Sequence, residues 1–259
     1  MARWRDRALA TRARRARERQ LEYMHRRAVR LAEHEERVMT NMATRSRLVR
    51  DGLSRHRPIA DEDKVLEVGS GATGLIFHFG TRDAIGIDPL ADHCARLFPA
   101  WQRGARILAA EGENLPFGDG TFDVVLSDNV IDHAERPAQI VREMTRVLQR
   151  GGILYLTVNI HHPIYHLSSR LYGAWKALGL PFEVTPMADH TVHLTAGAAR
   201  RLVSSLPLRV VEESATFDEN THGTAESRPR HLGDRLKRLF YKNVNLKVIA
   251  IREPDALGT

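Results

Sequence analysis

The sequence predicts an α/β protein, in which a doubly wound, mostly parallel sheet of seven strands has helices on both faces and follows a helical N-terminal extension. Two observations predict this fold. From residue 64 onward, short apolar segments typical of buried strands alternate with segments of helical periodicity, which is the pattern of a parallel sheet. Before residue 61 arginine dominates the composition and no strand pattern occurs.

The expected elements follow one another in the order that such a sheet requires. Strands are expected at 64–68, 84–88, 106–109, 122–127, 153–158, 208–212 and 245–251, and helices at 74–80, 91–102, 137–149 and 196–205. Between 161 and 193 the alternation stops, and we expect this histidine- and aromatic-containing insertion to form a lid over a ligand site. The predicted organisation is therefore an extension over 1–60 and one domain over 61–259 that includes the insertion.

The net charge of +7 is distributed unevenly along the chain. Residues 1–60 carry 17 arginines and 7 acidic residues, a net charge of +10, whereas the remainder carries 22 basic and 25 acidic residues, a net charge of −3. A nucleic-acid groove across the folded domain would need a basic face of its own. The charge balance therefore argues against nucleic acid as the partner of this domain.

An amphipathic helix is expected within the extension. Apolar residues recur there at alternating steps of three and four: Leu21, Met24, Ala28, Leu31, Val38 and Met42. We expect this stripe to pack on the α/β domain. Self-association into a homo-oligomer and peripheral contact with a membrane surface or another anionic partner are the alternatives.

Several classes of protein are disfavoured by composition. The chain has no run of 18 uncharged apolar residues, so no transmembrane helix is expected, and no apolar stretch follows the N-terminal charges as in a secretory signal. A single cysteine, Cys94, excludes an internal disulfide and a cysteine-rich zinc site. These features favour a cytoplasmic protein.

The strongest local signal is the segment VLEVGSGATG at 65–74, where an expected strand enters a glycine turn. Glycine is favoured where the backbone must approach a ligand or take a positive φ. The spacing is that of a dinucleotide-binding motif, and Asp88 lies where a ribose-binding acid would be found. Taken alone, the motif fits a dinucleotide site and an S-adenosylmethionine site equally well.

Three further features separate these two readings. Glu67 stands two residues before the first glycine, EGENLPF at 111–117 follows the third expected strand, and FDVVLSD at 122–128 leads through a helix to RGGIL at 150–154. In this order, the blocks resemble the class I S-adenosylmethionine-dependent methyltransferases, especially their small-molecule branch. The resemblance covers residues 62–160 clearly, extends weakly to 252, and implies a Rossmann-like fold.

The resemblance implies a cofactor, S-adenosyl-L-methionine, with S-adenosyl-L-homocysteine as its product. It assigns glycine-loop contacts to Gly69 and Gly71, orientation of that loop to Glu67, and the ribose hydroxyls to Asp88. The remaining implied contacts are Glu111 and Gly112 at adenine and Ser127 and Asp128 on the side facing the sulfonium. One departure is that the family's loop is usually one residue shorter, which leaves the role of Gly74 open.

The acceptor side is expected on loops that follow the strands. His133 and His162 are the candidate general bases, because they follow the fourth and fifth expected strands and imidazole titrates near neutral pH. Asn159 lacks a preceding Asp, so we expect no metal, although Asp128 and Asp132 with these histidines would be its ligands. The leading hypothesis is O-methylation of a small-molecule, sugar or lipid-linked acceptor. The alternatives are N-methylation of a small amine, methylation of RNA steered by the extension, a non-catalytic cofactor-binding protein, and an NAD(P)-dependent oxidoreductase.

Overall fold

A computed structural model describes residues 21–22, 25–26, 28, 34–134, 136–160, 194–217 and 244–254. The predicted lid at 161–193, and with it His162, lies outside these residues. Most of the predicted helix before residue 34 also lies outside them. Among the described residues, no helix is both long enough and apolar enough to cross a membrane.

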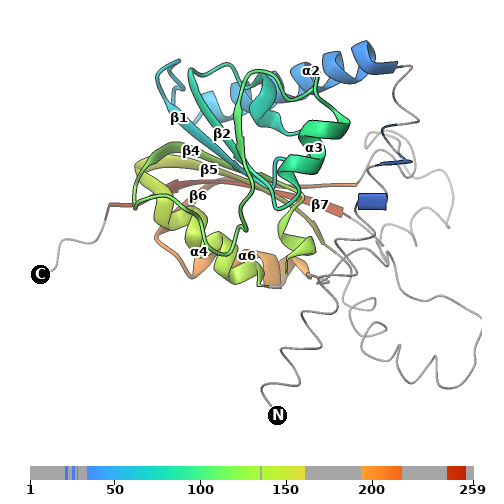
Figure 1. The fold of residues 1–259 in the computed structure, drawn as a ribbon. Helices are drawn as coiled ribbons and strands as arrows, with labels where there is room; N and C mark the ends of the chain where they lie inside the picture. Colours follow the sequence, from blue (N-terminus) through green and yellow to red (C-terminus); the bar gives the residue numbers. More distant parts are fainter. Residues whose placement is uncertain are drawn as a thin grey trace, which may run out of the picture.

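A single sheet of seven strands forms the centre of the molecule, in the order β3-β2-β1-β4-β5-β7-β6 (Figure 1). The strands are β1 (Lys64–Val68), β2 (Asp83–Ile87), β3 (Arg106–Leu108), β4 (Phe122–Asp128), β5 (Leu148–Ile160), β6 (Leu208–Phe217) and β7 (Val244–Arg252). Strands β1 to β5 pair in parallel, and β7 pairs antiparallel with both β5 and β6. The predicted fold class, a mostly parallel seven-stranded sheet, is therefore confirmed.

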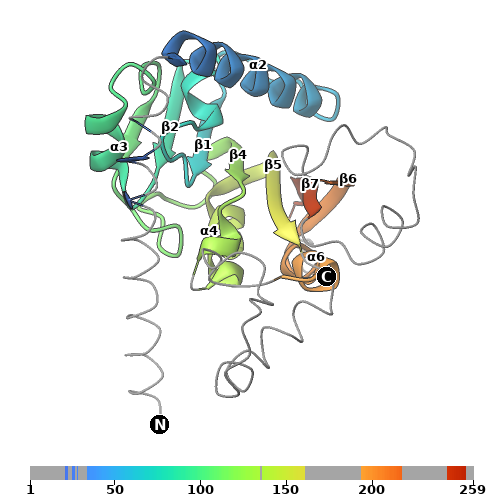
Figure 2. The ribbon, with the colours of Figure 1, turned by 90° about the vertical axis from the view of Figure 1, so that its right-hand side faces the viewer.

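The helices lie on both faces of this sheet, as Figures 1 and 2 show. They are α2 (Glu35–Ser54), the 3-10 helix η2 (Leu75–His78), α3 (Ala91–Leu97), the 3-10 helix η3 (Ile131–His133), α4 (Pro137–Val147) and α6 (Ala196–Ser204). Helices α2 and α3 cover one face, and α4 and α6 cover the other. Successive residues of a strand point to opposite faces, so Val65 packs beneath α2 while Leu66 packs beneath α4.

Helix α2 lies along one face of the sheet (Figures 1 and 2). Near its middle the buried Ser46 donates a hydrogen bond to the Leu75 carbonyl at 2.6 Å. One turn later Arg50 donates to the carbonyl of Gly80 at 3.1 Å and pairs with Asp61 at 2.9 Å. The helix is thus held on the domain by polar bonds as well as by the apolar contacts of Met42 and Leu53.

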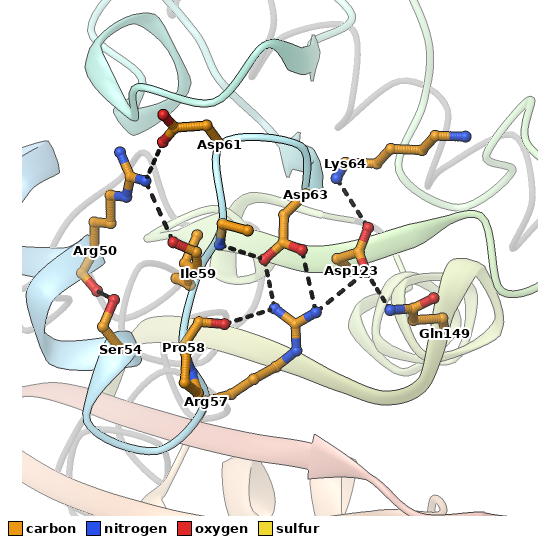
Figure 3. Close-up of polar contacts among 11 residues, drawn as sticks. Arg50, Ser54, Arg57, Pro58, Ile59, Asp61, Asp63, Lys64, Asp123 and Gln149 are labelled. Atoms are coloured by element: carbon orange, nitrogen blue, oxygen red, sulfur yellow. Dashed lines mark hydrogen bonds and ion pairs between the residues drawn. The ribbon is translucent and has the colours of Figure 1, made fainter.

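An ionic network joins the segment after α2 to the amino-terminal ends of three strands (Figure 3). The Arg57 guanidinium pairs with Asp63 at 2.6 Å and with Asp123 at 3.1 Å. Asp123 in β4 also accepts the Lys64 N–H of β1 at 2.9 Å and contacts Gln149 of β5. This network therefore lies at the amino-terminal ends of the strands. The loops that carry the candidate site lie at the opposite, carboxyl-terminal ends.

Three expected helices differ from the observed ones in type or by more than two residues in length. The segment expected to be helical over 74–80 forms only the 3-10 turn η2, and α3 ends at Leu97 rather than at 102. Conversely, the helix of the extension continues to Ser54, beyond the end of the apolar stripe. Leu21 and Ala28 of that stripe do pack, partly buried, against the core beneath α2, as expected.

Candidate cofactor and acceptor site

The sheet reverses its winding direction beside β1, because β2 lies on one side of this strand and β4 on the other. Ligands of open α/β sheets bind at such a switch point, outside the carboxyl ends of the strands. The loops after β1, β2, β3 and β4 all emerge at this edge, and the described residues of the predicted site lie on these loops or near the carboxyl ends of β1 and β4.

The glycine loop starts directly after β1. The N–H groups of Gly69 and Ser70 both donate to the Ile87 carbonyl, at 2.8 and 3.0 Å, which ties the loop to β2. Gly69 has a φ of +78°, and a Cβ there would lie 2.3 Å from Val130, beyond β4. A side chain at position 69 would therefore both strain the backbone and force the β1 and β4 loops apart.

Glu67 lies beneath this loop with its side chain buried. Its two carboxylate oxygens accept the N–H groups of Leu75 at 3.1 Å and Ile76 at 2.9 Å, at the start of η2. Burial raises the pKa of Glu67 to about 7, against the opposing effect of these two hydrogen bonds. Glu67 is thus bonded to the glycine loop that it was predicted to orient. Its contacts are at the far end of the loop, at Leu75 and Ile76, rather than at the first glycines.

The role of Gly74, which the sequence leaves open, follows from Glu67. A Cβ at position 74 would lie 2.5 Å from Glu67 Oε2 and 2.7 Å from the Ser70 carbonyl oxygen. Glycine is required there so that the carboxylate can reach the N–H groups of η2. The observed role of Gly74 is therefore in the internal packing of the loop.

Asp88 follows β2 and is almost completely buried. Its Oδ2 accepts the Gly71 N–H at 3.0 Å, and its Oδ1 accepts the Leu90 N–H at 2.7 Å. These two bonds fix the direction of the carboxylate and connect it to the glycine loop. A carboxylate at this position accepts hydrogen bonds only, which suits the paired hydroxyls of a ribose.

The loop after β3 carries the predicted adenine-binding pair. Glu111 is exposed at this edge, whereas Gly112 is buried against Val68 and Ile140. A carboxylate accepts from an exocyclic amine and a backbone N–H donates to a ring nitrogen, so the chemistry of this pair fits adenine. Gly71, Asp88, Glu111 and Gly112 thus lie on the loops that follow the neighbouring strands β1, β2 and β3.

Ser127 and Asp128, predicted together at the sulfonium side, point in different directions because neighbouring strand residues alternate. The Ser127 hydroxyl is buried, without a hydrogen-bond partner among the described residues. The Asp128 side chain accepts a 2.6 Å bond from Thr157 Oγ1 and forms an ion pair with Arg45 of α2. Of the two, Asp128 is the one placed at the carboxyl edge.

The sequence pattern did not indicate the contacts that Arg45, Asn129 and Asn245 make near the carboxyl end of β4. Asn129, directly after β4, has a φ of +56°, which is rare for a residue other than glycine. Its Oδ1 accepts a 2.6 Å bond from Asn245 Nδ2 of β7, and its N–H donates to Thr157. The only available signal was that asparagine tolerates a left-handed backbone better than most residues.

Of the two candidate bases, His133 ends η3 and is exposed on the loop after β4. The neighbouring Asp132 is buried and accepts a 3.3 Å bond from Asn159 Nδ2 at the end of β5. Among the described residues, no group of three His, Cys, Asp or Glu side chains is arranged to hold a metal ion.

Comparisons with known proteins agree with this geometry. The profile of a family described as "Methyltransferase domain" matches residues 66–156. An uncharacterized methyltransferase of Mycobacterium sp. (strain JLS) is 38% identical over 100 residues, which are 37% of this chain and 38% of the relative. The chain thus spans less than half the length of this relative and of the uncharacterized protein MJ1123 of Methanocaldococcus jannaschii, which is 34% identical over 108 residues.

Solved structures of low sequence identity share the fold. The crystal structure of the methyltransferase candidate BH2331 from Bacillus halodurans C-125 has a TM-score of 0.58 at 15% identity, covering 79% of this chain and 98% of its own. A geranyl diphosphate methyltransferase solved in complex with SAM has a TM-score of 0.57 at 14% identity, covering 85% and 90%. Residues 66–156 are therefore similar to the methyltransferase domain family, and the two solved structures share the fold of this chain.

Proposed function

We propose that this protein transfers a methyl group from S-adenosylmethionine to a hydroxyl of a small-molecule, sugar or lipid-linked acceptor. The observation that carries the proposal is the Asp88 carboxylate, which is buried at the switch point and held in direction by the N–H groups of Gly71 and Leu90. Such a preoriented acceptor of hydrogen bonds recognises a ribose, and it lies between the glycine loop and the loop of Glu111.

The residues assigned to the cofactor divide by the part that each would hold. Asp88 would accept the ribose hydroxyls, Glu111 and the Gly112 N–H would hold adenine, and the glycine loop would approach the methionine part. Asp128 would line the side facing the sulfonium, with Arg45 balancing its charge. S-adenosylmethionine supplies, when bound, a methyl group activated by a sulfonium.

The remaining requirement is that the acceptor is aligned, shielded from water and deprotonated. A hydroxyl is protonated at pH 7 and needs a base to accept its proton as it reacts. An uncharged amine nucleophile can react without such a base. His133 on η3 and His162 in the insertion are the proposed bases. A near-neutral α/β domain and a single buried cysteine agree with a small organic acceptor in a reducing cytoplasm.

The test is a screen of acceptor pools with methyl-labelled S-adenosylmethionine, followed by kinetics on the acceptor found. His133→Ala and His162→Ala are compared with His93→Ala on α3, which is the control. With both substrates saturating, replacing the true base should lower kcat by roughly 10²–10⁴-fold, as expected for lost general base catalysis, and the control should change it little.

The kinetics also separate the proposal from its nearest rival. If the two single variants and the double variant all keep the native kcat, neither His133 nor His162 acts as the base. Label recovered on an amine with these variants fully active would replace O-methylation by N-methylation. Failure of every pool to take up label, with S-adenosylmethionine bound, would leave a cofactor-binding protein without transferase activity and refute the proposal.

A further inference from the structure

The loop over 111–119 carries the proposed adenine-binding residues, and the backbone groups of Leu115 and Phe117 in this loop bond to α4. Glu143 Oε2 accepts the Leu115 N–H at 2.9 Å. Arg146 donates to the carbonyls of Leu115 at 3.1 Å and Phe117 at 2.8 Å. Two side chains of one helix therefore hold three backbone groups of this loop.

Glu143 and Arg146 are also bonded to each other. They lie three residues apart on α4, where side chains share a face. The guanidinium donates from Nε to Oε1 at 2.9 Å and from Nη2 to Oε2 at 2.8 Å, in the bidentate arrangement that is strongest for this pair. The hydrogen bond from Arg146 lowers the pKa of Glu143, so its carboxylate stays ionised and accepts the Leu115 N–H.

The anchored residues connect directly to the adenine-binding pair. The Asn114 N–H donates to the Glu111 carbonyl at 3.2 Å, closing a turn that ends one residue before Leu115. Leu115 is 3% exposed, and the Phe117 ring meets Phe122 edge to face at 4.9 Å between centroids. A displacement of Leu115 would therefore move the turn that presents Glu111.

We infer that Arg146 and Glu143 are positioning residues that set how well the site recognises the amino group of adenine. They act from α4 through the loop backbone. The inference rests on the proposed function, since it assumes that Glu111 and the Gly112 N–H face adenine. It goes beyond that function by assigning purine recognition to a pair on a helix outside the cofactor-binding loops.

This role is tested by measuring the affinities of two ligands for the native protein and for matched variants. S-adenosylhomocysteine is compared by calorimetry with S-inosylhomocysteine, in which an oxygen replaces the 6-amino group. The native protein should bind the first at least tenfold more tightly, and Arg146→Ala should reduce this ratio to about threefold or less. Arg142→Ala is the control, because Arg142 is exposed one turn earlier on α4 and its side chain bonds to Gln139 rather than to the loop.

The ratio, unlike a single affinity, is insensitive to a general loss of stability. If Arg146→Ala weakens both ligands by the same factor, or leaves both unchanged, the positioning role is wrong. Glu143→Gln, which keeps the volume of the side chain, provides the same measurement if Arg146→Ala does not fold. A native protein that binds both ligands equally would overturn the inference alone, whereas one that binds neither would refute the proposed function.

Discussion

Glu67 shows what a single residue contributes and how far its role could be foreseen. Its place two residues before the glycine loop predicted an orienting role, because the motif is local in sequence. Its hydrogen-bond partners were not predictable from the sequence. The N–H groups of Leu75 and Ile76 come within hydrogen-bond distance of the carboxylate only because the chain turns back over it. The same turn of the chain requires glycine at position 74, and the spacing of the glycines in the sequence did not predict this requirement.

The raised pKa of Glu67 predicts a pH dependence of stability. The folded protein holds this proton up to a pKa of about 7, whereas the unfolded chain releases it near the ordinary value of 4.5. The stabilisation is therefore complete below pH 4.5 and is lost as the pH rises to about 7, an effect of roughly 3 kcal/mol. Glu67→Gln cannot ionise and should lack this slope.

Urea unfolding of the native protein and Glu67→Gln at pH 5, 6, 7 and 8 measures the difference, in which other titrating groups cancel. The advantage of the native protein should be largest at pH 5 and shrink towards pH 8. A difference in unfolding free energy that stays constant across this range would show that the carboxylate is not destabilised by burial.

At the scale of an element, α2 is where the sequence was least informative. The apolar stripe predicted packing, but it gave no reason for the helix to continue to Ser54. Ser46 and Arg50 hold the later turns through hydrogen bonds to backbone carbonyls. Such bonds are not reflected in the periodicity of apolar residues, from which the helix was predicted. The same holds for Arg45, whose contact with Asp128 depends on a packing arrangement between residues far apart in the chain.

Arg45 makes α2 part of the charge balance of the site, which can be tested with two forms of the cofactor. Arg45→Ala would leave the Asp128 carboxylate without its counter-charge beside the proposed sulfonium position. S-adenosylmethionine carries that cation and S-adenosylhomocysteine does not, so the variant should favour the former by about threefold or more relative to the native protein, a modest Coulombic effect at an effective dielectric near 20. Binding of both ligands is measured by calorimetry, with the exposed Arg47→Ala as the control. An unchanged preference would show that Asp128 does not face the sulfonium.

For the whole molecule, alternation of strand and helix patterns predicted a parallel sheet, and the motif blocks predicted which strand ends carry the cofactor residues. Both rest on short segments, in which spacing determines local structure. The position of β7 between β5 and β6 depends on pairing between distant segments. The bond between Asn129 and Asn245 depends in the same way on the folded chain, which brings these two distant residues together.

The central claim is that the edge built around Asp88 binds an adenosyl cofactor of the S-adenosylmethionine class. Calorimetry with S-adenosylhomocysteine and with NADH tests it most directly, on the native protein, on Asp88→Ala and on the control Asp83→Ala at the opposite end of β2. S-adenosylhomocysteine should bind the native protein and NADH should not. Asp88→Ala should weaken the binding at least tenfold, since charge-assisted hydrogen bonds contribute about 1.5–3 kcal/mol each, and Asp83→Ala should not. Binding of NADH in place of S-adenosylhomocysteine, or an unchanged affinity in a folded Asp88→Ala protein, would contradict the account.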